Sequence, residues 1–592
     1  MTECYHVHLG YDVLDAWTLS STGGACYGHP SVGKQNLVLP DHETDQSPPY
    51  FVHLAPLNRL PHHTRISHSS IEAHTHVMDT NALVDLVHEV QGQICVDKVN
   101  ETHRLGRLCL WVSTFHPDKL PCELEGSFHH GAFNAGMKMV FSDRTVWMVR
   151  FPREGEICDG YTDEKVAMEV TALRLIRERT AIPVPRVRVP RVRAWGPAAT
   201  NPLGLGPFII MDFIDGVSLS DLLQDHSAER PSRLMREDIS DHDVEIIYRQ
   251  MAGFLLQLFR LDFEQIGSLP PPPLTEAHRF TSLPRPLTFK AHSILQNGWF
   301  PGDRTKGFAT TTEYFQYVVG QDWKQLVHQP NSVCGEYDAQ NKYMAFKALR
   351  SFVPDLIHPK YNHGNFKLIC DDLGLANLIV RSKDDLTVVG VVDLEWSYIG
   401  PAQLFGSAPW WLLQDRPVNS AWDYNGEEPP EIAARTPGHE EKELSSLVKW
   451  SQESGAMWLH ILLSYGFNDH RSFPFTKLRQ HFGADGWAKR EKEFDCAEEL
   501  EAFALRKVGE LDKYDEDLEQ IEENKAFMDN GRMTKEEFIL AAAAIIEPRS
   551  SSSSVVNNEA SSDKIISGFV NVFSGKQYPR KTCPVSTVTP AL

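Results

Sequence analysis

The hydrophobic pattern in the first half of the chain alternates between strand-like and helix-like periods. Residues 137–141 and 146–151 are predicted to form two β-strands joined by a polar turn. Residues 163–180 carry apolar side chains every three or four positions, which predicts an amphipathic helix. A similar stripe covers residues 81–99. This part of the chain therefore predicts an antiparallel hairpin combined with helices.

From about residue 240 the pattern is mainly helical. Ser240, followed three positions later by Asp243, is typical of a helix start, and 493–530 is a charged amphipathic helical stretch. Two short β-branched runs, 378–380 and 388–392, predict a pair of strands around a polar turn. We expect an α+β fold with a small antiparallel-sheet lobe and a large, mainly helical lobe.

The two ends of the chain lack this periodicity. Residues 1–80 are rich in His, Pro, Ser and Gly, and 549–592 is Ser-rich, so we expect both to be disordered. The histidines of the first segment leave metal binding open, but their spacings do not share one helix face. Between these ends we expect a helix plus the small lobe at 81–215 and the helical lobe at 216–548.

Composition places the chain among globular proteins with a large core. The 592 residues suffice for two or more domains, and 42% are hydrophobic. Acidic residues outnumber basic ones by 79 to 58, which argues against nucleic acid or an anionic membrane as the main partner. Ten scattered cysteines without a Cys-x-x-Cys favour a reducing compartment over a disulfide framework. No secretory signal or long apolar run is visible, so we expect a cytoplasmic protein.

Three polar residues surround the two short strands. Asp372 precedes Asn377 by five positions, and Asp393 ends the second β-branched run. If the strands pair, Asn377 and Asp393 lie at neighbouring strand ends, close enough to share one cation. Phosphoryl transfer from ATP to a hydroxyl needs such groups, because one carboxylate orients and deprotonates the acceptor while an amide and a second carboxylate hold the metal.

This arrangement resembles the aminoglycoside phosphotransferase-like family of the protein-kinase-like fold, and in particular its large fungal group. The resemblance covers about residues 105–480, and its motifs include Gly131-Ala132-Phe133-Asn134, Val149-Arg150-Phe151-Pro152, a hinge strand ending in Asp212-Phe213, Arg285-Pro286-Leu287-Thr288 and Pro409-Trp410-Trp411. It implies a two-lobed α+β fold with a nucleotide-binding N-lobe. It also implies an ATP- and Mg²⁺-dependent phosphotransferase that acts on a hydroxyl of an unidentified small molecule.

The same resemblance implies roles for individual residues. Asp372 would be the catalytic base, and Asn377 and Asp393 would be the Mg²⁺ ligands. The implied nucleotide-site residues are Gly131, Asn134, Arg150, Glu169, Asp212 and Phe213. Arg150 stands where the family usually has a strand Lys, and we expect it to pair with Glu169 on the 163–180 helix. Backbone groups at the hinge would read adenine.

Two departures from the family pattern keep a second function open. Cys370-Asp371 replaces the usual His-Gly before the catalytic Asp, and Arg150 keeps the charge of Lys but not its geometry. We expect Asp371 to point away from the site, because successive residues of an extended loop face opposite ways. A catalytically inactive kinase-like binding or regulatory module is therefore the alternative. Protein-kinase activity is less favoured, since no Ala-Pro-Glu segment follows Asp393.

Two further features have weaker interpretations. Glu395 and Trp396 follow the metal carboxylate, and an aromatic face beside a carboxylate can bind an amine. Core packing is the favoured interpretation of the tryptophan, since large aromatics are mostly buried. Residues 185–189 are nearly repeated at 190–193, without an assigned function. The sequence does not identify the phosphoryl acceptor or the oligomeric state.

Overall fold

A computed structural model describes most of the chain between residues 81 and 546. The described residues are 81–158, 160–180, 192–223, 236, 238–269, 284–297, 306–407, 443–464 and 466–546. The segments expected to be disordered, most of the near-repeat and the Pro409-Trp410-Trp411 motif lie outside them. No helix among the described residues is long and apolar enough to cross a membrane.

The elements follow the predicted order of a sheet region and then a mainly helical region. The strands are β1 (Cys122–Leu124), β2 (His129–His130), β3 (Asn134–Phe141), β4 (Val146–Pro152), β5 (Val192–Gly196), β6 (Phe208–Asp212), β7 (Val217–Ser218), β8 (Gly267–Ser268), β9 (Lys367–Cys370), β10 (Leu378–Ser382), β11 (Asp385–Val391) and β12 (Ser397–Gly400). The helices are α1 (Ala82–Arg104), α2 (Arg107–Ser113), α3 (Thr162–Arg179), α4 (Leu219–Leu223), α5 (Asp241–Phe259), α6 (Phe289–Gln296), α7 (Thr311–His328), α8 (Glu336–Phe352), α9 (Glu443–Glu453), α10 (Ala456–Ser464), α11 (Phe473–Phe482), α12 (Ala484–Lys492), α13 (Ala497–Asp529) and α14 (Lys535–Ile546). The α+β class is confirmed, in the two-lobed organisation expected of a kinase-like fold.

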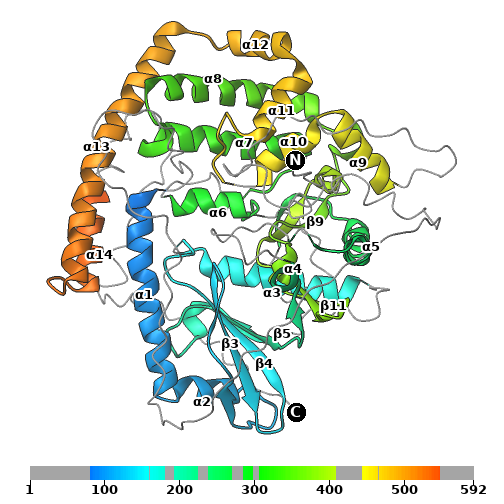
Figure 1. The fold of residues 1–592 in the computed structure, drawn as a ribbon, viewed down its shortest axis with the longest axis vertical. Helices are drawn as coiled ribbons and strands as arrows, with labels where there is room; N and C mark the ends of the chain where they lie inside the picture. The colour runs from blue at the N-terminus through cyan, green and yellow to red at the C-terminus, as the bar shows by residue number, and fades with distance from the viewer. Residues whose placement is uncertain are drawn as a thin grey trace, which may run out of the picture. The chain divides into compact units, whose positions relative to one another are not determined.

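The small lobe is built on an antiparallel sheet with the strand order β1-β3-β4-β6-β5. Strands β3, β4 and β5 of this sheet are labelled in Figure 1. The predicted β3–β4 hairpin is confirmed, and its register places Gly136 opposite Arg150. Its turn forms because Arg144 takes a φ of 70° and the Asp143 carboxylate accepts a 2.8 Å hydrogen bond from the Thr145 N–H. Trp147 is 2% exposed and packs in the core behind the sheet. The hairpin therefore delivers Arg150 from a rigid strand.

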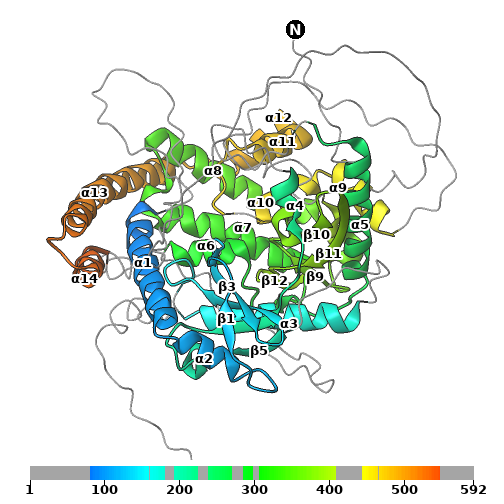
Figure 2. The same cartoon turned by 60° about the horizontal axis from the view of Figure 1, so that its bottom comes forward.

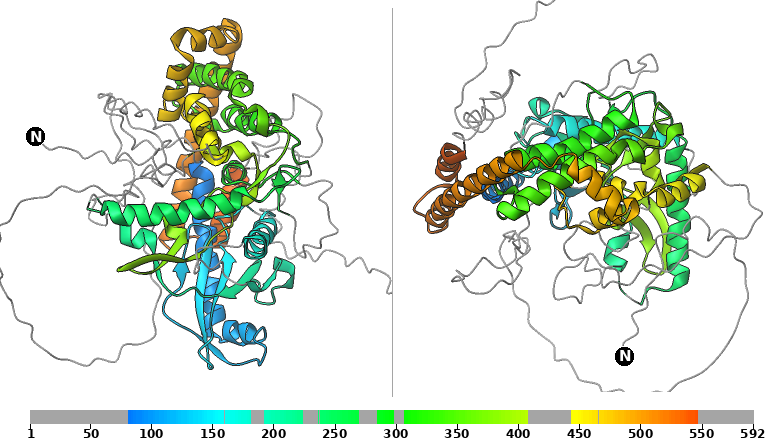
Figure 3. Two further views of the ribbon diagram at one scale, coloured as in Figure 1. Left: turned by 90° about the vertical axis from the view of Figure 1, so that its right-hand side faces the viewer. Right: turned by 90° about the horizontal axis from the view of Figure 1, so that it is seen from above.

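The helical lobe packs around several long amphipathic helices. Helix α5 begins as predicted, because the Ser240 side chain accepts a hydrogen bond from the Asp243 N–H. Helices α1, α13 and α14 share one apolar cluster and lie side by side in Figure 1. The long helix α13, orange in Figure 3, also runs along α8, where Tyr343 donates a 3.0 Å hydrogen bond to Glu499.

Short strands fix the loops that carry the candidate catalytic residues. Strand β12 pairs with β8 and β9, while β10 pairs with β11 and β7. Helix α5 flanks β11 (Figure 2), where the Gln250 side chain donates to the Leu386 carbonyl at 3.0 Å and accepts from the Val388 N–H at 2.8 Å. The loops before β10 and after β11 therefore start from anchored backbone.

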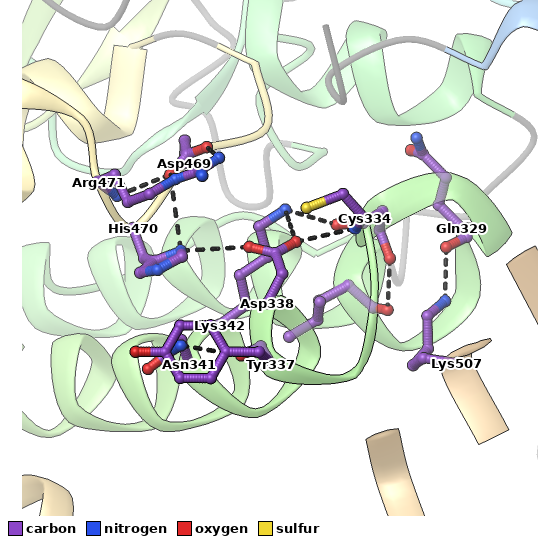
Figure 4. A network of polar contacts seen from close by, with 12 residues as sticks. Gln329, Cys334, Tyr337, Asp338, Asn341, Lys342, Asp469, His470, Arg471 and Lys507 are labelled. Atoms are coloured by element: carbon purple, nitrogen blue, oxygen red, sulfur yellow. Dashed lines mark hydrogen bonds and ion pairs between the residues drawn. The ribbon is translucent and has the colours of Figure 1, made fainter. Parts of the chain in front are cut away.

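A buried polar network lies around the start of helix α8 (Figure 4). Lys342 and Asp338 form an ion pair at 3.0 Å, one helical turn apart. The Nδ1 atom of His470 lies 3.8 Å from Asp338 and 3.6 Å from Asp469. Burial lowers the pKa of His470 to about 4, although both carboxylates act against this. His470 is therefore neutral in the native protein near pH 7.

Acid should destabilise the protein partly through His470. Its native pKa of about 4 lies below the ordinary 6.5. Between these two pKa values the unfolded chain binds a proton at His470 that the native state does not bind. The free energy of unfolding therefore falls as the pH drops from about 6.5 to 4. The wild type should lose roughly 2–3 kcal/mol more than His470→Asn between pH 7.5 and 4.5 in guanidinium unfolding. Exposed His363→Asn is the control, and parallel pH profiles for wild type and His470→Asn would contradict the account.

Candidate active site

The two candidate metal ligands are brought together by strand pairing. Leu378 of β10 pairs with Val391 of β11, and the Val392 N–H donates to the Asn377 carbonyl at 2.9 Å. Asn377 and Asp393 therefore flank the same end of the two strands. The predicted pairing of these strands is confirmed, including the polar turn that joins them.

The candidate catalytic loop is held by Asn377. Its side-chain Nδ2 donates a 2.5 Å hydrogen bond to the backbone carbonyl of Asp372. The donor end of the amide is thus used by the loop, so Oδ1 is the end that could face a cation. Asp372 itself is half-buried. The spacing of five residues lets one side chain fix the loop and serve the metal site.

The neighbouring Asp371 lies against two buried tyrosines. Burial raises the pKa of Tyr314 and of Tyr398 well above the ordinary value, and the charge of Asp371 raises both further. The Asp371 N–H also donates to the Trp396 carbonyl at 3.2 Å. The second carboxylate of this loop thus has a defined environment of its own.

Asp393 has an uncommon backbone conformation. Its φ is 59°, in the left-handed region that side-chain-bearing residues seldom adopt and that Asp and Asn tolerate best. The side chain is 31% exposed, whereas its partner Arg150 is 10% exposed. Such a conformation persists only where the surroundings hold it, here by the strand end and the ion pair.

Arg150 bridges the sheet, helix α3 and the Asp393 loop. Its Nη1 donates to Glu169 Oε1 at 2.6 Å, and its Nη2 donates to Asp393 Oδ1 at 2.6 Å. The predicted ion pair between Arg150 and Glu169 is confirmed. The planar guanidinium can serve two carboxylates at once, which a lysine ammonium does with less geometric definition.

Lys165 and Glu395 complete a cluster of two cations and three carboxylates, whose other members are Arg150, Glu169 and Asp393. Lys165, on α3, is fully buried and forms an ion pair with Glu395 Oε2. The same oxygen accepts a 2.5 Å hydrogen bond from Asn134 Nδ2, and it lies 3.8 Å from Arg150 Nη2. Through its hydrogen bond to Glu395, Asn134 therefore contacts the loop that carries Asp393.

Burial dominates the electrostatics of these carboxylates. It raises the pKa of Glu169 to about 7, although Arg150 acts in the opposite direction and Asp393 adds to the rise. Burial and the charge of Asp393 also raise the pKa of Glu395. Three carboxylates face two cations here, and binding of a further cation would favour their ionised forms.

The Gly131 loop folds back onto its own strand. The Gly131 N–H donates to the Asn134 carbonyl at 2.9 Å, and Arg153 Nη1 donates to the Gly131 carbonyl at 3.0 Å. Phe133 packs edge-on against Trp396, with ring centroids 5.2 Å apart. Trp396 is 1% exposed, so its role in core packing is confirmed.

The hinge residues have other partners. Arg193 Nε donates to Asp212 Oδ1 at 2.6 Å, and the Phe213 N–H donates to the Val146 carbonyl at 3.2 Å. The structure therefore joins Asn134, Arg150 and Glu169 in the cluster but gives Asp212 and Phe213 no contact with it among the described residues. Because the Phe213 N–H is already paired with Val146, it is not the group that would read adenine at the hinge.

The residues of the cluster fit a magnesium nucleotide. One oxygen from each of Glu169, Asp393 and Glu395 lies within 4.8 Å of the others. Mg²⁺ prefers oxygen ligands and keeps several waters, so it needs few protein ligands. Asp393 belongs to this group of oxygens, and Asn377 flanks the same strand ends. The Arg150 guanidinium matches phosphate oxygens.

Sequence reasoning overlooked Lys165 and assigned Glu395 to a different environment. Lys165 had a signal in its spacing, because it precedes Glu169 by four residues, which places the two on one helix face. Glu395 had no such signal, because Asp393 is left-handed and a turn follows it, so the alternation of an extended segment does not apply.

Comparison with known proteins gives only distant likenesses. No protein-family model matches the sequence. No curated protein matches it significantly. The similar solved structures include a macrolide 2′-phosphotransferase type I (12% identity, 68% of this chain and 97% of that chain, TM-score 0.30), macrolide 2′-phosphotransferase MphH from Brachybacterium faecium (13%, 67% and 97%, TM-score 0.30) and a provisionally assigned fructosamine-3-kinase from Thermobifida fusca (12%, 65% and 95%, TM-score 0.28). Likeness at this level carries no inference about activity, which must come from the site.

Removing the guanidinium should destabilise the fold in a pH-dependent way. Arg150→Met leaves buried Glu169 and half-buried Asp393 without their shared cation, which should cost about 3–5 kcal/mol near pH 7. The native pKa of Glu169, about 7, already exceeds the ordinary 4.5, and loss of Arg150, which opposes this rise, should raise it further. The stability lost on ionising Glu169 then continues to grow above pH 7 in the variant, where it has levelled off in the wild type. The loss in Arg150→Met should therefore be larger at pH 8.5 than at pH 6 in urea unfolding.

A matched surface variant separates this effect from a general loss of charge. Lys138→Met, on the same sheet, removes a pair with Glu125, which is 56% exposed. Such pairs contribute about 0–1 kcal/mol, so this variant should unfold nearly like the wild type at both pH values. Equal stability of Arg150→Met and Lys138→Met would show that the bridge does not hold the site.

Proposed function

We propose that this chain is an ATP- and Mg²⁺-dependent phosphotransferase that transfers the γ-phosphoryl group to a hydroxyl of a small molecule. It would belong to the kinase-like superfamily that includes the aminoglycoside phosphotransferase-like proteins. The observation that carries the proposal is the Arg150 bridge, which brings a strand cation, the α3 carboxylate Glu169 and the strand-end carboxylate Asp393 within 2.6 Å contacts.

Arg150 and Glu169 would form the phosphate-binding part of the site. Glu169 fixes one edge of the guanidinium, so the remaining N–H groups are held in a set direction. Arginine presents its donors as a planar fork that suits phosphate oxygens. When nucleotide binds, the contact of Nη2 with Asp393 would be shared with or passed to phosphate oxygens, while Glu169 keeps the side chain in place.

Asp393 and Asn377 would hold Mg²⁺ on the nucleotide phosphates. When bound, Mg·ATP supplies the transferable phosphoryl group, and its metal ion neutralises negative charge on the phosphates. Asn377 can serve the metal with Oδ1 while its Nδ2 keeps the catalytic loop in place. The left-handed backbone of Asp393 directs its carboxylate from the end of β11 toward Arg150.

Asp372 would act on the acceptor. Its carboxylate would accept the hydrogen bond of the acceptor hydroxyl, orient that oxygen and take its proton as the new P–O bond forms. The bond from the γ-phosphorus to the bridging oxygen breaks, and ADP leaves. Asn377 holds the loop through the Asp372 carbonyl, so the base is positioned by the residue that would also bind the metal.

A binding module without turnover is the second candidate. It is favoured by the direct contact of Arg150 with Asp393, because this contact occupies a carboxylate oxygen that a metal could otherwise use. The two functions differ in one outcome. An enzyme forms a phosphorylated product with a suitable acceptor, whereas a binding module retains Mg·ATP without consuming it.

Loss of the base should affect chemistry and spare binding. Asp372→Asn keeps the side-chain shape, so Mg·ATP should bind with wild-type affinity while ATP consumption falls by about 10²–10⁴. The assay is ADP release with a panel of amino alcohols, sugars, choline-like alcohols and aminoglycosides.

The adjacent carboxylate provides the matched control for this test. Asp371→Asn should retain most of the activity, because Asp371 lies against the tyrosines rather than in the proposed base position. A large loss in Asp371→Asn with none in Asp372→Asn would move the base by one residue. Binding of Mg·ATP without product from any acceptor would favour the binding module.

The metal carboxylate can be tested without disturbing the backbone. Asn tolerates the left-handed φ of Asp393, so Asp393→Asn removes the charge with little strain. Mg²⁺ should then raise ATP affinity far less than in the wild type in calorimetric titrations, because the metal loses its charged ligand. Asp384→Asn, in the exposed β10–β11 turn, is the control, and an unchanged Mg²⁺ effect in Asp393→Asn would refute the metal assignment.

A further inference from the structure

Lys165 is a buried cation with contacts on both sides of the active site. The ammonium is fully buried, pairs with Glu395 and lies 3.4 Å from Asn134 Oδ1. It also lies 5.9 Å from the ring centroid of Phe133 and 5.3 Å from that of Trp396. Two of these residues come from the start of β3 and the loop before it, and two follow Asp393 in the chain.

The two segments also contact each other directly. Asn134 Nδ2 donates to Glu395 Oε2 at 2.5 Å, and Phe133 packs on Trp396. The amide of Asn134 therefore uses its oxygen on Lys165 and its nitrogen on Glu395. A polar triad and an aromatic pair join the Gly131 loop to the segment after Asp393. The Lys165 ammonium, which comes from α3, contacts both segments through its side chain.

The surroundings of Lys165 argue against a direct role in phosphate binding. Its ammonium is enclosed by the carboxylate, the amide oxygen and two aromatic rings. Breaking a buried ion pair is unfavourable because it leaves an uncompensated buried charge. Lys165 should therefore keep Glu395 as its partner and act through the residues that it holds.

We propose that Lys165 is a positioning residue that pins the Gly131 loop to the segment carrying Asp393, so that both segments open and close as one unit. The role in catalysis rests on the proposed function, while the mechanical coupling does not. Asp393 lies two residues before Glu395, so a loop displaced at Asn134 would loosen one of the two ties on the segment that is expected to hold Mg²⁺, the other being the contact of Asp393 with Arg150. Nucleotide-loop order and metal affinity are thus linked.

The test replaces the ion pair by a neutral pair of similar size. The double variant Lys165→Met/Glu395→Gln avoids the unpaired buried charge that could unfold either single variant. Asn134→Ala is the second variant, since it leaves the ion pair intact and removes only the loop end of the triad. The control is Lys290→Met/Asp322→Asn, which neutralises another fully buried pair, with a 2.8 Å contact, between α6 and α7.

Hydrogen–deuterium exchange measures the coupling of the two segments in the absence of nucleotide. Peptides covering residues 131–136 and 392–397 should both exchange about tenfold faster or more in the double variant and in Asn134→Ala, because a hydrogen bond to a charged group contributes roughly that factor to a local opening equilibrium. The control pair should not accelerate these two segments selectively. Acceleration of one segment alone, or of neither, would overturn the proposal.

A second readout connects the coupling to function. The Mg²⁺ concentration that half-saturates ATP binding should rise about tenfold in Asn134→Ala, because the same opening now competes with metal binding. If the wild type binds no Mg·ATP but both segments exchange faster together in the variants, the coupling by Lys165 is supported and the proposed function is refuted. If Mg·ATP binds and the two segments do not exchange faster together in the variants, the proposed function is supported and the coupling is refuted.

Discussion

The double ion pair of Arg150 is the interaction on which the rest of the site depends. One guanidinium reaches Glu169 on α3 and Asp393 after β11, residues that lie far apart in the sequence. All three groups converge only if the β3–β4 hairpin, α3 and the β10–β11 pair are placed correctly relative to one another. The bridge therefore makes the geometry of the candidate active site a consequence of the fold.

Burying these carboxylates is energetically unfavourable, and the cations around them compensate for it. Burial disfavours the charged forms of Glu169 and Glu395 and raises the pKa of both. Two buried cations, Arg150 and Lys165, oppose this rise in pKa. Lys165 is one of these cations, and by holding Glu395 it also ties Asn134 to the segment that carries Asp393. Charge balance and loop positioning thus use the same side chain.

Sequence patterns predicted what depends on local periodicity. The β3–β4 hairpin, helix α3, the β10–β11 pair and the Arg150–Glu169 ion pair were all expected from spacing or from the family resemblance, and the structure contains them. The contact of Glu395 with Lys165 and Asn134 was not expected, because it joins residues more than two hundred positions apart. Such contacts depend on how the lobes pack, which no short-range pattern encodes. The roles of Asp372, Asn377 and Asp393 in catalysis remain proposals that the geometry supports.

Nucleotide binding is the most direct test of the proposed phosphoryl-transfer site. The measurement is calorimetric titration of the wild-type protein with a non-hydrolysable ATP analogue, with and without Mg²⁺. We predict binding at one site per chain that is markedly tighter with Mg²⁺, because Asp393 and Asn377 would hold the cation against phosphates that Arg150 would contact. No binding, or binding that is indifferent to Mg²⁺, would contradict the interpretation of this cluster as a phosphoryl-transfer site.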